Sequence, residues 1–261
     1  MEIQNGDFRM HYEERGNGEP LVLLHGNGES LEYFSGQMAY FSKTFRVIAV
    51  DTRGHGRSGR GRAPFTLEQF GEDLHKFCLG LGIGRMHLLG FSDGANIALG
   101  FAGKHPEMVE SLILNGANLR PSGVKLSVQA GIAAGWALVS VLSPAVRDCR
   151  RKRELLGLMV TQPHYGEREL KALTMPTLVI AGDRDMIRES HTREIAAGIE
   201  GSRLVILKGD HFIAAKEPEA FNRAVGDFLD AVRALRSGEA VKKPLAGASW
   251  RRNEEDIGDK H

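Results

Sequence analysis

The segment Gly90-Phe91-Ser92-Asp93-Gly94 carries the residue types of a nucleophilic site. It follows an apolar run over 86–91 and precedes a helix-like stretch, so Ser92 is expected at a sharp turn from a strand into a helix. The flanking glycines allow the strand and the helix to pass closely, which projects the serine hydroxyl above the sheet. The alternative is an ordinary turn in which Ser92 only caps the helix. In this context the pattern predicts a serine nucleophile.

A serine hydroxyl is a poor nucleophile at neutral pH, so it needs a base to remove its proton and an acid to orient that base. His211 follows an apolar run over 204–207 and is the histidine best placed to be the base. Two acids, Asp183 and Asp185, follow another apolar run and are both candidates for the orienting group. The chain order serine, acid, histidine is the order that this arrangement requires. The residues alone leave the choice between the two acids open.

Stabilisation of a tetrahedral oxyanion is the third requirement of this chemistry. The segment His25-Gly26-Asn27-Gly28 ends a further apolar run, and the backbone N–H of Asn27 is a candidate donor. The N–H of Asp93, directly after the nucleophile, is the second. A plain glycine turn is the alternative for the first segment. Because the Asp93 carboxylate brings negative charge near the oxyanion, we expect it to turn toward the helix N-terminus or a basic partner.

Short apolar runs that alternate with helical patterns must form the sheet that positions these residues. They span 21–24, 47–50, 86–91, 112–114, 178–181 and 204–207. Runs that are apolar on both faces are typical of a parallel sheet covered by helices. Residues 2–13, interrupted by Asn5-Gly6-Asp7, predict an antiparallel hairpin before them. We therefore expect an α/β fold with about eight, mostly parallel strands.

Two amphipathic helices are predicted beside this sheet. Apolar residues repeat at three- and four-residue steps over 67–81 and over 218–236, and Thr66 to Gln69 resembles a capping box at the start of the first. Residues 237–261 are polar and lack periodicity, which predicts a flexible tail.

Residues 118–176 form a connection too long for one crossover helix. We expect a helical insertion that acts as a lid, because it rises from the strand ends where open α/β sheets bind ligands. The core then consists of 1–117 and 177–236.

Within the insertion, Val124–Leu142 predicts a buried or half-buried helix, and Trp136 is expected to pack the lid against the site. Five cations over 147–153 predict a solvated helix face; recruitment of an anionic substrate is the alternative.

The segment 54–59 matches the Gly-x-Gly-x-x-Gly pattern of dinucleotide sites, but a stretch with Pro64 intervenes before the next helical pattern. We expect no such site, and we expect Asp51 and Arg53 to form an ion pair that holds this loop. Cys78 and Cys149 fit neither a metal spacing nor a disulfide framework.

Five segments resemble signature segments of the α/β-hydrolase family, in that family's order. They are Leu23-Leu24-His25-Gly26, the stretch from Asp51 to Ser58, the stretch from Gly90 to Gly94, the stretch from Gly182 to Asp185, and Gly209-Asp210-His211. The resemblance covers about residues 1–236 and implies a lid between the sixth and seventh strands. In that family the acid stands three residues after the glycine of its segment, which implies Asp185 rather than Asp183. It implies no substrate.

The balance of charged residues limits the classes of partner that the chain can bind. The chain has 34 Lys+Arg against 33 Asp+Glu and a pI near 7.9, which argues against nucleic-acid binding or a polybasic membrane contact. The longest apolar stretch is too short for a membrane span, and the first residues do not resemble a secretory signal, so a cytoplasmic location is expected.

Together these features predict a serine hydrolase that cleaves a small carboxylic ester or thioester without a metal or cofactor. Ser92, Asp185 and His211 would be catalytic, and Asn27 and Asp93 would bind the oxyanion. Two alternatives remain: a carbon–carbon bond hydrolase or enol-lactonase with the same triad, and a non-catalytic ligand receptor. The oligomeric state does not follow from the sequence.

Overall fold

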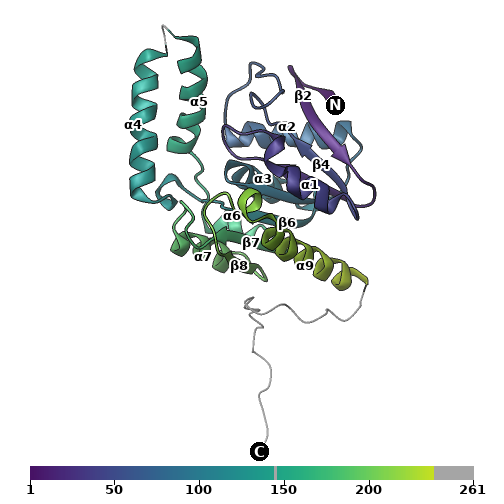
Figure 1. Cartoon of the computed structure of the whole chain (residues 1–261). Helices are drawn as coiled ribbons and strands as arrows, with labels where there is room; N and C mark the ends of the chain where they lie inside the picture. Colours follow the sequence, from purple (N-terminus) through teal and green to yellow (C-terminus); the bar gives the residue numbers. More distant parts are fainter. Residues whose placement is uncertain (144–145, 238–261) are drawn as a thin grey trace, which may run out of the picture.

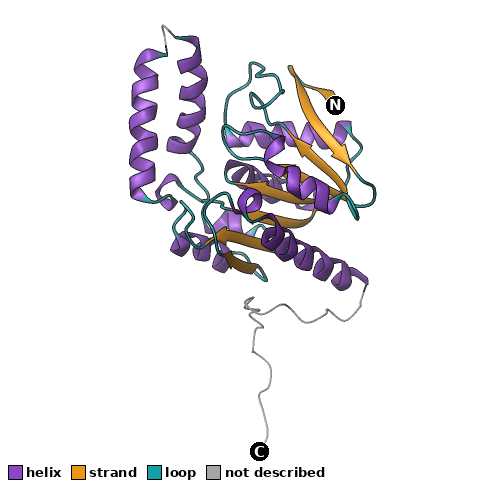
Figure 2. Cartoon of the chain, viewed as in Figure 1, coloured by secondary structure: helices purple, strands orange, loops and turns teal. Residues whose placement is uncertain are grey.

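A sheet of eight strands forms the centre of the protein, and helices cover both of its faces (Figure 2). The computed structural model describes residues 1–143 and 146–237, so the tail predicted over 237–261 lies outside the described residues except for Ser237. The strands are β1 Glu2–Asn5, β2 Phe8–Arg15, β3 Pro20–Leu24, β4 Arg46–Val50, β5 Met86–Phe91, β6 Val109–Asn115, β7 Thr177–Gly182 and β8 Arg203–Leu207. Their order in the sheet is β1-β2-β4-β3-β5-β6-β7-β8.

The pairing of the strands is mostly parallel. Every pair from β4 through β3, β5, β6 and β7 to β8 is parallel. β1 and β2 form the predicted antiparallel hairpin around Gly6, which has a φ of 61°, and β2 is antiparallel to β4. The expected α/β fold with a mostly parallel sheet is confirmed.

The helices are α1 Ser35–Phe41, α2 Leu67–Gly80, α3 Asp93–Lys104, α4 Leu126–Leu142, α5 Arg147–Thr161, α6 Glu167–Lys171, α7 Glu189–Gly198, α8 Ile213–Lys216 and α9 Pro218–Ser237. They form two layers around the sheet, except for α4 and α5, which pack on each other. Alternate side chains of strand β3 pack against opposite layers. Leu21 and Leu23 pack toward α1 and α9, whereas Val22 and Leu24 pack toward α2 and α3. All four side chains are buried, as a strand covered on both faces requires.

The predicted ends of the two amphipathic helices agree with the structure. The side chain of Thr66 accepts a hydrogen bond from the backbone N–H of Gln69 at 3.2 Å, which caps α2. Helix α9 buries Phe221, Val225 and Leu229 against the sheet. These caps and apolar faces fix the loops that follow β4 and β8.

The connection between β6 and β7 contains helices of its own, as expected. Helices α4 and α5 lie side by side as a hairpin that stands clear of the sheet (Figure 1). No residue of α4 is fully buried, but several, among them Ile132, Trp136 and Val139, are partly buried. The half-buried helix of the two expected forms is therefore the one observed, because the hairpin projects from the body and α5 covers one side of α4. Trp136, expected to face the site, lies against Gly157 of α5. Within the two described ranges, no helix is long and apolar enough to cross a bilayer.

The ion pair expected between Asp51 and Arg53 does not form. Asp51 accepts hydrogen bonds from backbone N–H groups of Leu31 and Arg57 and lies 3.1 Å from His11 Nδ1. Arg53 turns the other way and makes a bidentate pair with Asp73 of α2, with both contacts at 2.7 Å. The buried guanidinium of Arg53 thus pairs with the Asp73 carboxylate, whose two oxygens match its two N–H donors, while Asp51 accepts hydrogen bonds from the backbone.

Candidate active site

Ser92 lies in the turn between β5 and α3 and has a φ of 53° and a ψ of −121°. It is the one non-glycine residue with a positive φ in the part of the chain that the structure describes. A Cβ at Gly90 would lie 2.3 Å from the carbonyl oxygen of Gly94, and a Cβ at Gly94 would lie 2.1 Å from that of Leu24. Both positions therefore need glycine. The strained turn leaves the Ser92 side chain partly exposed above the sheet.

Three polar side chains meet at the carboxyl ends of β5, β7 and β8. His211 Nε2 lies 3.0 Å from Ser92 Oγ, and His211 Nδ1 lies 2.7 Å from Asp185 Oδ1. Asp185 and His211 are 3% and 5% exposed. The Asp185 oxygen also accepts the N–H of Ile187 at 2.8 Å, which fixes the carboxylate. With Nδ1–H donating to that carboxylate, the lone pair on Nε2 faces the serine hydroxyl.

Asp183, the other acid that the residues left open, has a different role. Its Oδ1 accepts the backbone N–H of Gly209 at 2.9 Å, and its side chain is 47% exposed. This contact holds the loop that carries His211. The structure thus brings Asp185, and not Asp183, against the imidazole of His211.

The segment around Gly26 lies directly against the nucleophile, since a Cβ at Gly26 would be 3.2 Å from the Cβ of Ser92. His25 Nε2 accepts the N–H of Thr52 at 3.1 Å, so Nδ1 carries the hydrogen and donates to the Gly26 carbonyl at 2.7 Å. Burial lowers the pKa of His25, which keeps this arrangement neutral. The backbone N–H of Asn27 makes no backbone hydrogen bond to another described residue.

The Asp93 side chain is buried and held by two amides. Its Oδ2 accepts from Asn27 Nδ2 at 2.8 Å, and its Oδ1 accepts from Asn96 Nδ2 at 3.2 Å. Burial raises the pKa of Asp93, and the two amide donors oppose this rise. Of the two expected surroundings, a basic partner is not found among the described residues. The side chain lies at the N-terminus of α3, where neutral amide donors hold it, one of them in the first turn of that helix. The backbone N–H of Asp93 makes no backbone hydrogen bond among the described residues.

Glu29 and Tyr33 are site residues that sequence reasoning missed. The Tyr33 ring stacks on Phe91 at 4.2 Å between centroids, and Phe91 lies 4.8 Å from the ring of His211. Glu29 is close enough to His211 to interact electrostatically with it, and burial raises the pKa of Glu29 to about 7. Within the described residues, neither Glu29 Oε2 nor the Tyr33 hydroxyl has a hydrogen-bond partner. The signal available in the sequence was their place just beyond the Gly26 segment.

Helix α5 contacts the same segment. Asn27 Nδ2 donates to the Leu155 carbonyl at 2.9 Å as well as to Asp93, and Arg60 pairs with Glu154 of α5 at 2.6 Å. The inner side of the hairpin therefore touches the loop that faces Ser92.

The basic run of α5 is divided between two environments. Arg150 and Arg153 donate to the carbonyl and hydroxyl oxygens of Ser143 at the turn of the hairpin. Arg151 and Lys152 are exposed, as a solvated helix face requires.

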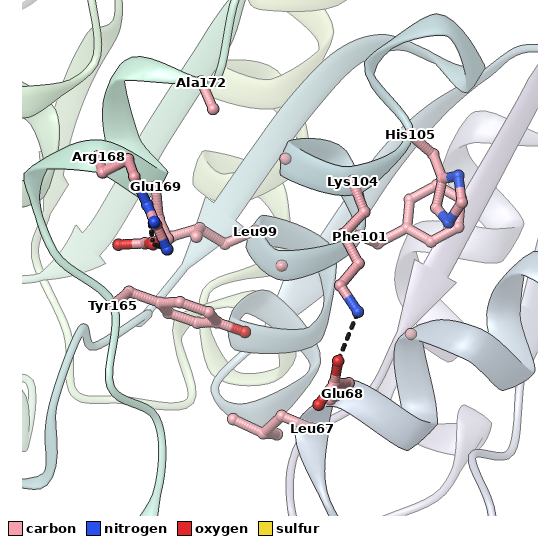
Figure 3. A pocket seen from close by; sticks show the side chains of 13 residues that line it. Leu67, Glu68, Leu99, Phe101, Lys104, His105, Tyr165, Arg168, Glu169 and Ala172 are labelled. Carbon is pink, nitrogen blue, oxygen red and sulfur yellow. Dashed lines mark hydrogen bonds and ion pairs between the residues drawn. The ribbon is translucent and has the colours of Figure 1, made fainter.

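A separate cavity of about 490 Å³ opens among α2, α3 and α6 (Figure 3). Its charged groups pair with one another, Lys104 with Glu68 at 2.7 Å and Arg168 with Glu169 at 2.9 Å. Tyr165 forms one wall and donates its hydroxyl to the Asn96 carbonyl at 3.0 Å. Ser92, Asp185 and His211 are not among the residues that line this cavity, so the cavity is distinct from the candidate active site.

Comparison with known proteins identifies the family. Residues 19–137 match the family model described as alpha/beta hydrolase fold. The (E)-2-((N-methylformamido)methylene)succinate hydrolase of Acinetobacter baylyi is 37% identical to this chain, over 84% of this chain and 94% of that protein. The chain belongs to the α/β-hydrolase fold family. Two further similarities are to a protein named as a lactonase and a protein named as a hydrolase.

One is the solved enol-lactonase of Burkholderia xenovorans, with a TM-score of 0.75, 25% identity and coverage of 88% of this α/β-hydrolase and 100% of that chain. The other is the 2-hydroxymuconate semialdehyde hydrolase of Pseudomonas putida, which is 26% identical over 90% of this chain and 96% of that protein.

Proposed function

We propose that this α/β-hydrolase cleaves a small carboxylic ester or thioester through an acyl-enzyme formed on Ser92. The observation that carries the proposal is the pair of contacts from Asp185 to His211 at 2.7 Å and from His211 to Ser92 at 3.0 Å. A serine hydroxyl on a strained turn, next to an oriented imidazole, is the arrangement that nucleophilic catalysis requires.

In the acylation step, Ser92 Oγ attacks the carbonyl carbon while His211 Nε2 takes the hydroxyl proton. Asp185 holds the imidazole in the tautomer whose Nε2 can accept this proton. The N–H groups of Asn27 and Asp93 donate to the oxyanion of the tetrahedral intermediate. When the intermediate collapses, the bond to the leaving oxygen or sulfur breaks, and His211 returns the proton to that atom.

In the deacylation step, His211 removes a proton from water, and the hydroxide attacks the acyl carbon bound to Ser92. The second tetrahedral intermediate uses the same two N–H donors. Its collapse releases the carboxylic acid, and the proton returns from His211 to Ser92 Oγ. The cycle needs no group beyond those already named.

In this proposal, residues 118–176 act as the lid over a core formed by 1–117 and 177–236. The hydrogen bond from Asn27 to the Leu155 carbonyl supports this role, because it joins α5 to the segment that would bind the oxyanion. A lid in this place shields the site from bulk solvent while it still admits the water that deacylation needs, and it shapes the acyl pocket.

A carbon–carbon bond hydrolase or an enol-lactonase is the second candidate, and the names of the similar proteins favour it. The enol-lactonase has the fold described here, and the 2-hydroxymuconate semialdehyde hydrolase is similar in sequence over most of its length. A non-catalytic ligand receptor is the third candidate; the contacts of His211 with Ser92 and Asp185 weigh against it.

Labelling with a fluorophosphonate tests the nucleophile. We expect an adduct on Ser92 that is absent in Ser92→Ala and greatly slowed in His211→Ala, and Ser92→Ala should lower kcat by about a million-fold. Ser35→Ala is the matched control, because Ser35 is an exposed serine at the start of α1. Wild-type protein that folds but takes up no probe would support the receptor instead.

A substrate panel separates the two enzymatic candidates. Turnover of p-nitrophenyl esters and acyl thioesters of rising chain length is expected to exceed that of enol-lactones and vinylogous diketones. If kcat/KM is highest for an enol-lactone or a diketone, the second candidate replaces the ester hydrolase, while the role of Ser92 stands.

A further inference from the structure

The outer face of α4 is an apolar surface that the described residues leave uncovered. Helix α4 has 17 residues, none charged and none buried. Leu126, Leu138 and Val141 are 84%, 63% and 78% exposed. A helix that is apolar on every side normally lies in a core or against a partner. The described residues of one chain do not cover this face, so we look for a partner that does.

One ridge of α4 is complementary to itself. Residues four apart lie along one ridge of a helix. In α4 the exposed ridge consists of Leu126, Ala130, Ala134, Leu138 and Leu142. Ala134 stands at its middle. If a second α4 crosses it antiparallel about a twofold axis at Ala134, each Leu138 meets the Ala130 of the other copy, and each Leu126 lies on the side of Leu142.

We propose that two copies of this chain associate through α4, with the helices antiparallel and crossing at Ala134. Alanines at the crossing point let the helix axes approach to about 8 Å, and the leucines fill the space on either side. The absence of charge over 126–142 means that two copies of the ridge do not repel each other. The hairpin carries this ridge clear of the sheet, where a second copy can reach it (Figure 1). Such a twofold interface uses the same surface of both copies.

The size of the face sets the expected affinity. A helix of 17 residues presents a strip about 25 Å long. That is at the small end of specific protein interfaces, so we expect a dissociation constant of roughly micromolar order. The dimer is therefore expected to form and dissociate with protein concentration.

An anionic membrane surface is the competing partner, because five cations over 147–153 follow α4. A helix that lies in a bilayer interface carries cations on its own polar face, and α4 has none. Two of the α5 cations, Arg150 and Arg153, are engaged by Ser143 at the turn of the hairpin. The charge-free, self-complementary ridge therefore favours a second copy.

Sedimentation velocity on the full chain tests the proposal over about 1 to 100 µM. The apparent mass should rise from 28.6 kDa toward twice that value with concentration. Ala134→Glu and Leu138→Glu should both keep the chain at the lower mass, since each places a charge at the crossing. Leu79→Glu is the matched control: Leu79 is 62% exposed on α2, and this variant should still dimerise. Circular dichroism checks that every variant is folded.

Cross-linking tests the position of the twofold axis. In a Cys149→Ser background, Ala134→Cys should form a disulfide-linked dimer with oxidised glutathione, whereas Ser127→Cys, exposed but distant from the axis, should not. The proposal is overturned by a chain that stays at 28.6 kDa throughout, or by a dimer that Ala134→Glu leaves intact. Monomers that sediment with phosphatidylserine vesicles, and lose this in Leu138→Glu, would overturn it in favour of the membrane.

Discussion

At the carboxyl ends of β5, β7 and β8, Asp185 and His211 are buried and each has a fixed hydrogen-bond partner. Across the molecule, α4 has no buried residue and carries its apolar side chains into solvent. In the first region, the side chains that orient His211 and Ser92 are packed within one copy of the chain, whereas the described residues leave the apolar face of α4 uncovered. We therefore expect substitutions at the sheet edge to change catalysis and substitutions on α4 to change association.

At the sheet edge, Asp185→Asn is expected to reduce catalysis strongly. An amide at this position can donate to Nδ1 of His211, which favours the tautomer with hydrogen on Nε2, and that nitrogen then cannot accept the proton of Ser92. We expect kcat for a p-nitrophenyl ester to fall by about ten-thousand-fold.

Asp183→Asn is the matched control for this prediction, two residues away in the same loop. An amide oxygen still accepts the N–H of Gly209, so we expect kcat to change by less than about threefold. Equal losses in the two variants would mean that the acid assigned from the structure is wrong.

The sheet edge was predictable from the sequence because its signals are local. A serine between glycines after an apolar run, and a histidine after a later run, each report a strand end, and parallel strands bring their carboxyl ends together. The choice of Asp185 over Asp183 needed the family resemblance, since both acids follow the same strand. Local spacing does not tell which of two nearby carboxylates points at an imidazole.

The pairing of Arg53 and the surroundings of α4 were not predictable, because each depends on distant contacts. Arg53 meets Asp73, 20 residues further along the chain, and Asp51 meets His11, 40 residues earlier. The apolar composition of α4 predicts a helix, but burial depends on what packs against it. Glu29 was missed for the same reason, because its place beside His211 follows from the course of the loop after β3.

Asp93→Asn examines the point where α5, the helix that packs on α4, meets the sheet edge. Asn27 Nδ2 donates both to Asp93 and to the Leu155 carbonyl of α5, so this amide joins the hairpin to the sheet edge. The side chains of Asn27 and Asn96 both donate to the Asp93 carboxylate. The NH₂ group of an asparagine at this position would therefore face one of these donors, and that hydrogen bond would be lost. One lost hydrogen bond corresponds to at most about a ten-fold fall in kcat. A loss as large as that of Ser92→Ala would mean that the carboxylate itself takes part in the reaction.

Glu29→Gln removes a partly buried carboxylate of the candidate site whose Oε2 has no hydrogen-bond partner among the described residues, and we expect it to change how the stability of the protein depends on pH. The pKa of Glu29 is about 7 in the folded protein and 4.5 as the reference for the unfolded chain. The folded state thus binds the proton more tightly than the unfolded state. The stability that this proton contributes is fully present below pH 4.5 and is lost as the pH rises through 7. Above that pH, the folded protein bears the desolvation cost of a partly buried carboxylate, which glutamine does not bear.

Thermal unfolding measured at pH 5 and pH 8 checks this expectation. At pH 8, Tm of Glu29→Gln should exceed that of the wild type by about 2 to 4 °C, and the difference should largely disappear at pH 5. Glu32→Gln is the control, because Glu32 is an exposed neighbour three residues along the chain, and it should show no such pH-dependent gain. If Glu29→Gln is instead less stable than the wild type at pH 8, the folded protein stabilises the Glu29 carboxylate. That result would contradict the raised pKa of Glu29 and would mean that this carboxylate has a partner.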